Sequence, residues 1–293
     1  AIHSSLDAWQ KLFAGRAEEN YDIAVVFNPE ELLLHGFPEA SSLRASTSMH
    51  WGDKALHALL KSGYAFRPLS LQDFLAEKKT YKVTIFLNAW TLNQEIREEL
   101  QVRQRQQGIF TIWCHAPGLV TEEGFNPTAM KMLTGLELAV DDSTLPFQAQ
   151  LNDGTELACR YRGKVVTEAP RIYCNDREAE VLATYTDNQQ IALAFKRLPE
   201  GAKVIWSGLP IHRPDLWRKL FQRAGLQAQT EAGITFYSDS SVSVLHTAKA
   251  GSWNLSISGP LVDLFGSDIQ SRADETTISS KGPQTWLLWK EKK

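Results

Sequence analysis

The chain has 293 residues, and two domains are the default expectation because a single hydrophobic core stops growing near this size. Its 43% hydrophobic and 22% charged residues are typical of a globular protein. The formal net charge is -3, with acidic and basic residues interspersed, which argues against a nucleic-acid partner because nucleic acid requires a basic face. No apolar run reaches about 18 residues, so we expect no membrane-spanning helix and no membrane partner.

Cysteine usage and motif content limit the chemistry that the chain can support. Cys114, Cys159 and Cys174 show no CxxC pair, so the sequence predicts no zinc site and no other metal. An odd number of scattered cysteines argues against a disulfide framework and leaves room for one bridge at most, so the cellular compartment stays open. No GxGxxG or GxxxxGK[ST] motif occurs, so we expect no cofactor. The start at Ala1 without a signal-peptide pattern favours a piece of a longer protein over a processed chain.

The first half of the sequence alternates strand-like and helix-like segments. Residues 23–27 form a short apolar run that predicts a buried strand, and the Asn-Pro pair after it predicts a short helix over 28–34. A helix is expected over 53–62, ending at Gly63, and a strand over 64–68. This alternation is typical of an α/β protein.

The next unit gives the clearest pattern. Residues 83–87 and 109–113 are apolar runs that predict buried strands. Between them, Thr91 and Gln94 have the spacing of a capping box, which predicts the start of a helix that ends at Gly108. A strand, a crossover helix and a strand in this order predict a parallel pair.

The pattern then changes before the parallel-sheet alternation returns. Asn126 and Pro127 predict a helix start, with its end at Gly135. The turn-punctuated stretch 147–185 predicts a β-hairpin insertion. Apolar runs at 191–195 and 204–206, followed by a helix from Pro214 to Gly225, then indicate further strands of the parallel sheet.

From about Gly233 onward the sequence predicts a small antiparallel β domain. Its expected strands are 242–246, 253–257, 276–279 and 285–289. About sixty residues are few for a domain that is stable alone. Trp253, Trp286 and Trp289 could form a sugar platform, but Trp286 and Trp289 are an odd number of residues apart and face opposite ways on a strand.

Candidate binding residues follow the predicted strands, because ligands of open α/β sheets bind beyond the carboxyl ends of the strands. Asn88, Trp90, His115 and Glu123 lie after the strands at 83–87 and 109–113. His50 precedes a predicted helix and pairs a hydrogen-bonding group with neighbouring tryptophan, a combination that suits sugars. The structural alternative for these residues is the packing of loops and helix starts.

Cys114 is the weak candidate for a catalytic residue, and otherwise we expect none. A nucleophilic thiol requires a base or a helix N-terminus that stabilises the thiolate. Residues adjacent on an extended chain point to opposite faces, so His115 is poorly placed to activate Cys114. A buried structural thiol is the favoured interpretation. Glu122 and Glu123 are neighbours in one loop and do not oppose each other as the carboxyls of a glycosidase do.

Three stretches carry a family resemblance: 81–90 (YKVTIFLNAW), 112–118 (IWCHAPG) and 132–135 (MLTG). They resemble the class I glutamine-amidotransferase-like domain that follows the catalytic barrel in family-42 β-galactosidases and related large bacterial glycoside hydrolases. Residues 245–247 (LHT), Gly251 and 262–265 (VDLF) are similar to the small C-terminal β domain of these enzymes.

The resemblance implies a flavodoxin-like open, mostly parallel sheet in residues 1–228 and a small all-β domain in 229–293. It implies a non-catalytic accessory or oligomerisation region, whose partners are the parent enzyme's catalytic barrel, further copies of the chain and an oligosaccharide. A bacterial cytoplasm and periplasm are both compatible with it. Two alternatives stay open: a stand-alone carbohydrate-binding protein, and a small hydrolase or amidotransferase that uses Cys114.

The sequence departs from the family in two respects. Active amidotransferases have a glycine-flanked cysteine, whereas Trp113 and His115 flank Cys114, so amidotransferase activity does not carry over. The barrel that supplies the glycosidase carboxyls does not fit in this chain beside the segments already assigned. Glycosidase activity is therefore expected of the parent enzyme and not of this chain alone.

Overall fold

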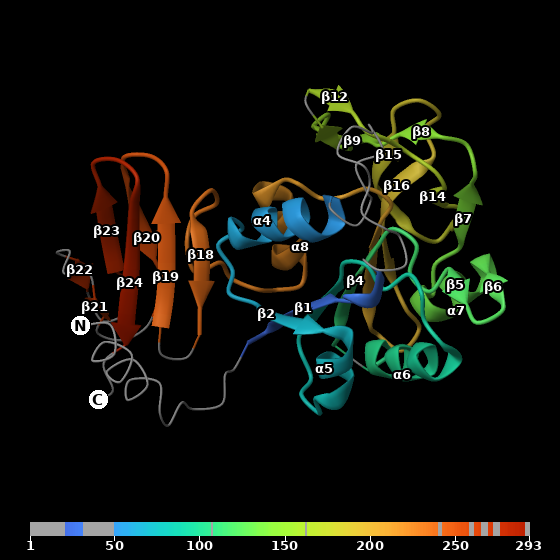
Figure 1. The fold of residues 1–293 in the computed structure, drawn as a ribbon, viewed down its shortest axis with the longest axis horizontal. Coiled ribbons are helices and arrows are strands. Elements are labelled where there is room, and N and C mark those ends of the chain that lie inside the picture. Colours follow the sequence, from blue (N-terminus) through green and yellow to red (C-terminus); the bar gives the residue numbers. More distant parts are fainter. Residues whose placement is uncertain are drawn as a thin grey trace. The chain divides into compact units, whose positions relative to one another are not determined.

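The computed structural model describes residues 21–31, 50–106, 108–161, 163–239, 242–257, 261–264, 269–271 and 276–290. The chain divides into two compact units (Figure 1). The α/β unit comprises the described residues of Asp22–Leu59 and Phe66–Gln227, and the β unit comprises Tyr21, Leu60–Ala65 and the described residues from Ala228 onward. In the described part of the chain, no helix is both long and apolar enough to cross a membrane.

The centre of the α/β unit is a parallel sheet of five strands. In spatial order these are β2 (Arg67–Ser70), β1 (Ile23–Phe27), β3 (Val83–Phe86), β4 (Phe110–Cys114) and β17 (Lys203–Ser207), and each neighbouring pair is parallel. The apolar runs predicted as strands at 23–27, 83–87 and 109–113 become β1, β3 and β4, which are buried along nearly their whole length. The predicted parallel pair is confirmed.

Antiparallel strands extend this sheet beyond β17. The expectation that 191–195 returns to the parallel order is wrong, because β16 (Ile191–Arg197) pairs antiparallel with β17. The reason is the tight turn 198–202, in which Leu198 N donates to Ala202 O; a parallel pair would require a crossover of a dozen or more residues. The other strands of this part are β7 (Leu138–Asp141), β9 (Gln148–Leu151), β10 (Glu156–Ala158), β14 (Arg171–Cys174) and β15 (Glu180–Tyr185).

The α/β unit also has two-stranded sheets that are separate from its main sheet. They are β5 (Val120–Thr121) with β6 (Gly124–Phe125), β8 (Leu145–Pro146) with β13 (Thr167–Glu168), and β11 (Arg160–Tyr161) with β12 (Lys164–Val165). The stretch predicted as a hairpin insertion thus contains β9 and β10, which form a hairpin, and several strands around them.

The helix signals hold only in part. The helix predicted to end at Gly108 ends at Gln104, a helix at 71–76 was not predicted, and residues 32–34 of the helix predicted over 28–34 lie outside the described residues. A π-helical turn at His50–Lys54 (η1) leads into α4 (Ala55–Leu60), and α5 (Leu71–Ala76) is capped by Ser70. The predicted capping box is wrong: Asn93 caps α6 (Gln94–Gln104), while the Thr91 hydroxyl donates to Glu31 Oε2 at 3.2 Å and Gln94 Nε2 donates to Glu98. An asparagine closer to the helix satisfies its first N–H groups, so Thr91 is free for a longer-range bond.

Two further helices agree with the sequence. In α7 (Pro127–Thr134), Asn126 is the N-cap, Pro127 is the first residue, and Gly135 ends the helix in the left-handed region with φ 74°. In α8 (Pro214–Arg223) the side chains predicted to face inward are all buried, namely Leu216, Trp217, Leu220 and Phe221.

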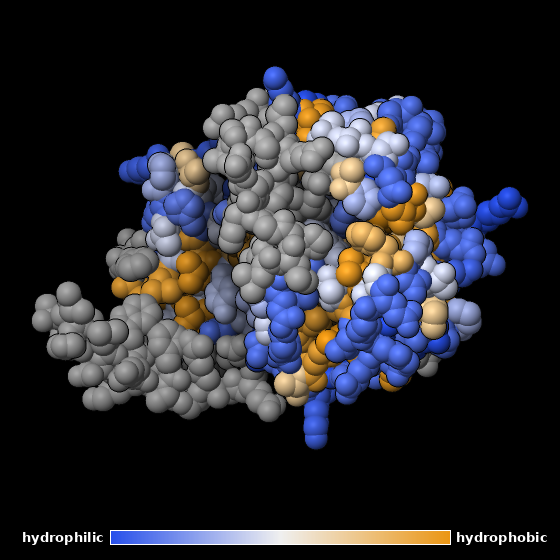
Figure 2. Space-filling model, turned by 45° about the vertical axis from the view of Figure 1, so that its right-hand side comes forward, coloured by the Kyte–Doolittle hydropathy of each residue, from blue (hydrophilic) through white to orange (hydrophobic). Residues whose placement is uncertain are grey.

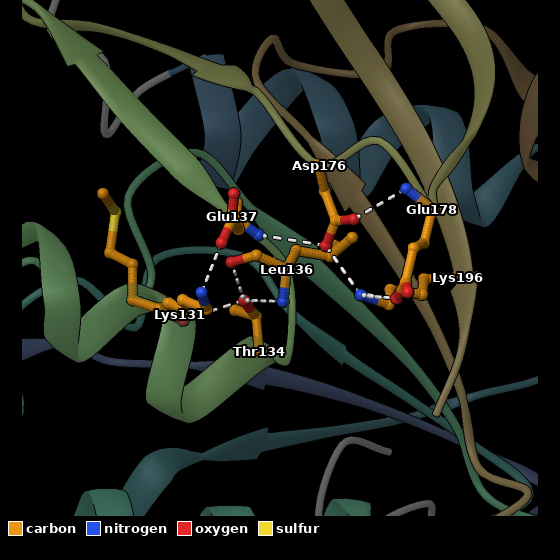
Figure 3. A network of polar contacts seen from close by, with 8 residues as sticks. Lys131, Thr134, Leu136, Glu137, Asp176, Glu178 and Lys196 are labelled. Carbon is orange, nitrogen blue, oxygen red and sulfur yellow. Dashed lines mark hydrogen bonds and ion pairs between the residues drawn. The ribbon is translucent and has the colours of Figure 1, made fainter. Parts of the chain in front are cut away.

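A polar network joins the end of α7 to the antiparallel strands (Figure 3). The Asp176 carboxylate accepts from Lys196 Nζ at 2.8 Å, and from the backbone N–H groups of Glu178 at 3.0 Å and Glu137 at 3.2 Å. Lys131 pairs with the Glu137 carboxylate. Asp176 is buried, and these three hydrogen bonds satisfy a charge that would otherwise be costly to bury.

The β unit consists of two small antiparallel sheets. One has the order β18 (Thr235–Ser238), β19 (Val242–Thr247), β24 (Gln284–Lys290) and β21 (Leu261–Asp263), and the other β20 (Gly251–Leu255), β23 (Thr276–Ser280) and β22 (Gln270–Ser271). The predicted C-terminal antiparallel strands are confirmed.

The core of the β unit is formed by side chains of both sheets, and a segment that is distant in the sequence packs against it. Trp286 is fully buried there and meets Trp253 edge-on at 6.0 Å between ring centroids, so Trp286 does not belong to an exposed platform. Gln229 N donates to Gly63 O at 2.7 Å, and Ala65 N donates to Gln229 Oε1 at 2.7 Å. The segment Leu60–Ala65 is thereby part of the β unit.

Candidate functional site

The carboxyl ends of β1 and β3 meet in a pair of asparagines. Asn28 N donates to Asn88 Oδ1 at 2.7 Å, and Asn88 Nδ2 donates back to Asn28 O at 2.8 Å. Asn28 Oδ1 also accepts from Glu30 N at 3.3 Å. Both asparagines are buried. Because the strands are parallel, their ends lie at one edge of the sheet, and the side chain of Asn88 joins them there through the backbone of Asn28.

A buried carboxylate lies next to this pair. Glu31 Oε1 accepts from the backbone N–H groups of Trp90, at 3.1 Å, and of Thr91, and Glu31 Oε2 accepts from the Thr91 hydroxyl. The side chain of Glu31 is fully buried. These donors satisfy both oxygens of a buried acidic side chain, which would otherwise be costly to bury. Glu31 therefore fixes the loop that follows β3.

Aromatic rings surround His115 at the end of β4. The Trp90 ring meets the imidazole edge-on at 5.3 Å between centroids, and the rings of Trp51 and Phe147 lie at 5.8 Å and 5.9 Å. The backbone of His115 has φ 60°, a left-handed conformation that a non-glycine residue adopts only where its surroundings hold it. Here Trp206 Nε1 donates to His115 O at 2.7 Å, and His115 N donates to Ser207 O at 2.7 Å.

The thiol of Cys114 does not have the properties of a nucleophile. Its side chain is 1% exposed, and burial raises the pKa of the thiol far above its ordinary value. A reactive cysteine requires the opposite, a lowered pKa and access to a substrate. The carbonyl of Cys114 accepts from Trp90 Nε1 at 3.2 Å, which again ties the loop after β3 to β4.

The structure brings together three of the five predicted binding residues. Asn88, Trp90 and His115 lie in the buried cluster at the carboxyl ends of β1, β3 and β4. Glu123 lies elsewhere, exposed on the β5–β6 turn, where its N–H donates to Thr121 Oγ1 at 3.2 Å. The side chain of His50 falls outside the described residues. A ligand at the buried cluster would have to displace internal hydrogen bonds, and ligand binding by these residues stays a prediction.

The carboxyl groups do not resemble a glycosidase pair. The backbone N–H groups of Glu122 itself and of Gln94 hold the pKa of the Glu122 carboxyl below its ordinary value, whereas a general acid requires a raised pKa. The pKa is lowered as well at each other described carboxyl with a clear shift: Asp141, Asp153, Asp176 and Asp215. Within the described ranges, no group of three or more His, Cys, Asp or Glu side chains could hold a metal ion.

A cavity at the other edge of the parallel sheet was missed by the sequence reasoning. It has a volume of about 280 Å³ and lies between α5, α6 and the first residues of β3 and β4. Thr84 and Thr111, which face each other across the β3–β4 pair, are among the residues that line it. The available signal was a polar residue at the second position of two strands that are otherwise apolar.

No family model matches the sequence, and no curated protein is similar to it. The fold resembles solved β-galactosidases. One from Bacillus circulans sp. alkalophilus aligns with a TM-score of 0.62 at 15% identity, over 92% of this chain and 41% of that one. The β-galactosidase from Rahnella sp. R3 aligns with a TM-score of 0.61 at 14% identity, over 97% of this chain and 43% of that one. A catalytic mutant of a GH42 β-galactosidase from G. stearothermophilus aligns with a TM-score of 0.59 at 13% identity, over 93% of this chain and 40% of that one.

At these identities the likeness concerns the fold. The chain spans about two fifths of the length of the β-galactosidases that it matches. Nearly all of this chain takes part in the alignments, including strands of both units. The chain therefore has the fold of a region that forms part of larger β-galactosidase chains.

Proposed function

We propose that this chain is a non-catalytic accessory and oligomerisation region of a larger glycoside hydrolase, and that its partner is the catalytic barrel of that enzyme. One observation carries the proposal: the alignments cover 92% of this chain but only 41% of the Bacillus circulans β-galactosidase. A region of this kind lacks the machinery of the whole enzyme.

The chemistry of the described residues supports the non-catalytic part of the proposal. The thiol of Cys114 is buried and has a raised pKa, which disfavours a hydrolase or amidotransferase that uses it. The acidic side chain of Glu122 has a lowered pKa and binds Arg97 at 3.6 Å. Neither group is suited to donate a proton or attack a substrate near neutral pH.

We further assign the α/β unit to the flavodoxin-like, glutamine-amidotransferase-like folds. The support is the strand order β2-β1-β3-β4-β17, all parallel. In chain order this is 2-1-3-4-5, the flavodoxin-like order. The proposed domain boundaries are 1–228 and 229–293, and the β unit's additional segment Leu60–Ala65 makes the second domain discontinuous.

Exposed apolar side chains on α6, β6 and α7 support the oligomerisation part. Val102 is 67% exposed, Phe125 77% and Met132 62%, and Figure 2 shows hydrophobic surface among hydrophilic side chains. The helices α6 and α7 are neighbours, because Gln101 Nε2 donates to Met132 O at 2.7 Å. We infer that a second copy of the chain covers this face, since a large apolar side chain gains free energy when another protein removes it from water.

Light scattering over a concentration series tests the proposal. The unmodified chain should form a discrete oligomer, and the double variant Val102→Lys, Met132→Lys should be a monomer with unchanged thermal stability. The control Tyr237→Lys alters a side chain of the β unit that is 39% exposed and should leave the oligomer intact. A monomer at every concentration would overturn the oligomerisation role. Hydrolysis of a chromogenic glycoside by the purified chain would overturn the non-catalytic role.

A further inference from the structure

A second cavity of the α/β unit lies between α8 and the antiparallel part of the sheet. It has a volume of about 240 Å³ and opens to solvent. Its floor and walls come from β9, β15, β16 and α8, each of which contributes at least one leucine: Leu151, Leu182, Leu193, Leu216 and Leu220. Side chains from four separate elements thus converge on one apolar space.

The strand register explains how three of these leucines meet. Leu151 of β9 and Leu193 of β16 both pair with Ala183 of β15, so they flank the same point of the sheet. The β15–β16 register shifts between Val181 and Ala183, and a β-bulge of this kind redirects a side chain. Leu182 lies at the bulge and lines the cavity together with the other two.

The helix α8 supplies the opposite wall. Leu216 and Leu220 are four residues apart and therefore lie on one face of the helix, where they are 4% and 3% exposed. Among the lining residues, all of which lie in the described part of the chain, none is aromatic. Leucine side chains offer water no hydrogen-bond partner, whereas they pack well against hydrocarbon. The cavity is therefore suited to an aliphatic group.

The polar groups at the mouth are satisfied within the protein. Asp153 pairs with Lys219 at 2.7 Å, and Arg223 pairs with Glu180 at 2.5 Å. Asn152, the remaining polar residue of the lining, donates from its side chain to a carbonyl of β15 at 2.6 Å. Each charge that lines the cavity thus has a partner of opposite sign. The mouth consequently favours neither an anion nor a cation, and an uncharged polar end is the better match.

We propose that this cavity binds the hydrocarbon chain of a small amphipathic molecule whose uncharged polar end stays in solvent at the mouth. Removal of the chain from water by the leucine side chains would supply the affinity. At the packing density of a protein interior, the volume suits a chain of about six to eight carbon atoms. The site does not depend on the accessory role proposed above.

Calorimetry on the full chain with a series of alkan-1-ols tests the site. Hexan-1-ol should bind with a Kd of about 1 mM. Each further CH₂ group should lower the Kd about fourfold until the chain fills the cavity, after which the Kd should level off. Absence of binding at about 10 mM hexan-1-ol would overturn the site. A Kd that keeps falling through decan-1-ol would overturn it as well, because unspecific adsorption to apolar surface has no upper chain length.

A matched ligand tests the orientation of the bound chain. Hexane-1,6-diol has the length of hexan-1-ol but a hydroxyl at both ends, so one hydroxyl would lie among leucines without a hydrogen-bond partner. It should bind at least about tenfold more weakly than hexan-1-ol. Equal binding of the two alcohols would overturn the proposed burial of the hydrocarbon end.

Two substitutions of Leu182, which is half-buried at the edge of the cavity, test its location. Leu182→Trp should fill the space, weaken the binding of hexan-1-ol by about tenfold or more, and leave the melting temperature unchanged or higher. Leu182→Gln keeps the side-chain length but removes apolar surface, and it should weaken binding at least about threefold.

The control Leu264→Trp makes the same substitution at a leucine of the β unit that is 39% exposed, and it should bind hexan-1-ol like the unmodified chain. Binding that both Leu182 variants leave unchanged would overturn the site, as would equal losses in the control. These outcomes leave the accessory role untouched, since that role fails separately if the chain hydrolyses glycosides.

Discussion

Asn28 and Asn88 bind each other through two hydrogen bonds, of 2.7 Å and 2.8 Å, that join the carboxyl ends of β1 and β3. Each bond pairs the amide of the Asn88 side chain with a backbone group of Asn28. The arrangement imitates one further step of the β1–β3 ladder after the strands have ended. The sequence pattern places both asparagines at strand ends, but it does not reveal that they satisfy each other.

Replacing Asn88 should destabilise the chain strongly. Asn88→Ala leaves the N–H of Asn28 buried without a partner and leaves its carbonyl with the Glu31 N–H alone, at 3.3 Å. We therefore expect the free energy of unfolding to fall by about 1–3 kcal/mol. Urea denaturation followed by tryptophan fluorescence measures this change. The exposed Asn175 provides the control, since Asn175→Ala should change stability by less than about 0.5 kcal/mol. Equal effects at the two positions would contradict the role of the asparagine pair.

The cysteines should be unreactive in the native chain. All three are free and buried, and burial raises the pKa of Cys174 to about 11 and that of Cys114 still further. A thiol reagent such as DTNB, applied near pH 8, should therefore label almost no thiol until denaturant is added, when three thiols react. Rapid labelling of Cys114 in the native state would revive the interpretation of this residue as a nucleophile.

The Asp176 network should make the chain sensitive to acid. Burial raises the pKa of the Asp176 carboxyl, but the hydrogen bonds from Lys196 and from the N–H groups of Glu178 and Glu137 outweigh it and hold the pKa below its ordinary value. The folded state then binds fewer protons than the unfolded state. Its contribution to stability is present above the unfolded pKa of about 3.9 and is lost as the pH falls through the lower folded pKa.

The variant Asp176→Asn tests this linkage. We expect it to lose about 2–3 kcal/mol at neutral pH and to show a weaker loss of stability than the unmodified chain as the pH falls below 4. Urea unfolding at a series of pH values gives both quantities. Glu178→Gln alters a carboxylate that also pairs with Lys196, at 3.0 Å, but whose side chain is largely exposed. It should cost less than about 1 kcal/mol.

Arg103 should be important for the stability of α5. Its guanidinium donates to three carbonyl oxygens at the end of that helix, including those of Phe74 and Leu75, groups that would otherwise lack partners. Arg103→Ala should lower the free energy of unfolding by about 2–3 kcal/mol. Arg103→Lys should restore only part of it, because an ammonium cannot reproduce the planar fork of donors. Arg105 is exposed at the C-terminal end of α6, so Arg105→Ala should leave the free energy of unfolding nearly unchanged.

The sequence predicted the parts of the fold that depend on local signals. The apolar runs at 23–27, 83–87 and 109–113 form β1, β3 and β4, because a strand buried on both faces must be apolar throughout. Asn126, Pro127 and Gly135 mark the ends of α7, since a cap, a fixed φ and a left-handed glycine act within a few residues. These signals require no knowledge of distant contacts.

The incorrect predictions concern elements whose structure depends on residues distant in the sequence. Thr91 has the spacing of a capping residue, but its hydroxyl donates a hydrogen bond to Glu31 instead. The run at 191–195 looks like a parallel strand, yet the short turn before β17 makes it antiparallel. Likewise, the strand sequences contain Thr84 and Thr111, but only the β3–β4 register brings the two hydroxyls to one cavity. The spacing of residues along the chain does not predict such a pairing.

The discontinuous β unit has a consequence for how the chain is made. Ala65 and Gln229, which are joined by a hydrogen bond, are separated by 164 positions in the sequence. At ribosomal elongation rates of 5–20 residues per second, the segment Leu60–Ala65 would leave the ribosome roughly ten to thirty seconds before its partners. During that interval its backbone groups must be satisfied by water or by a chaperone. The β unit can therefore close only late in synthesis, after nearly the entire α/β unit has emerged.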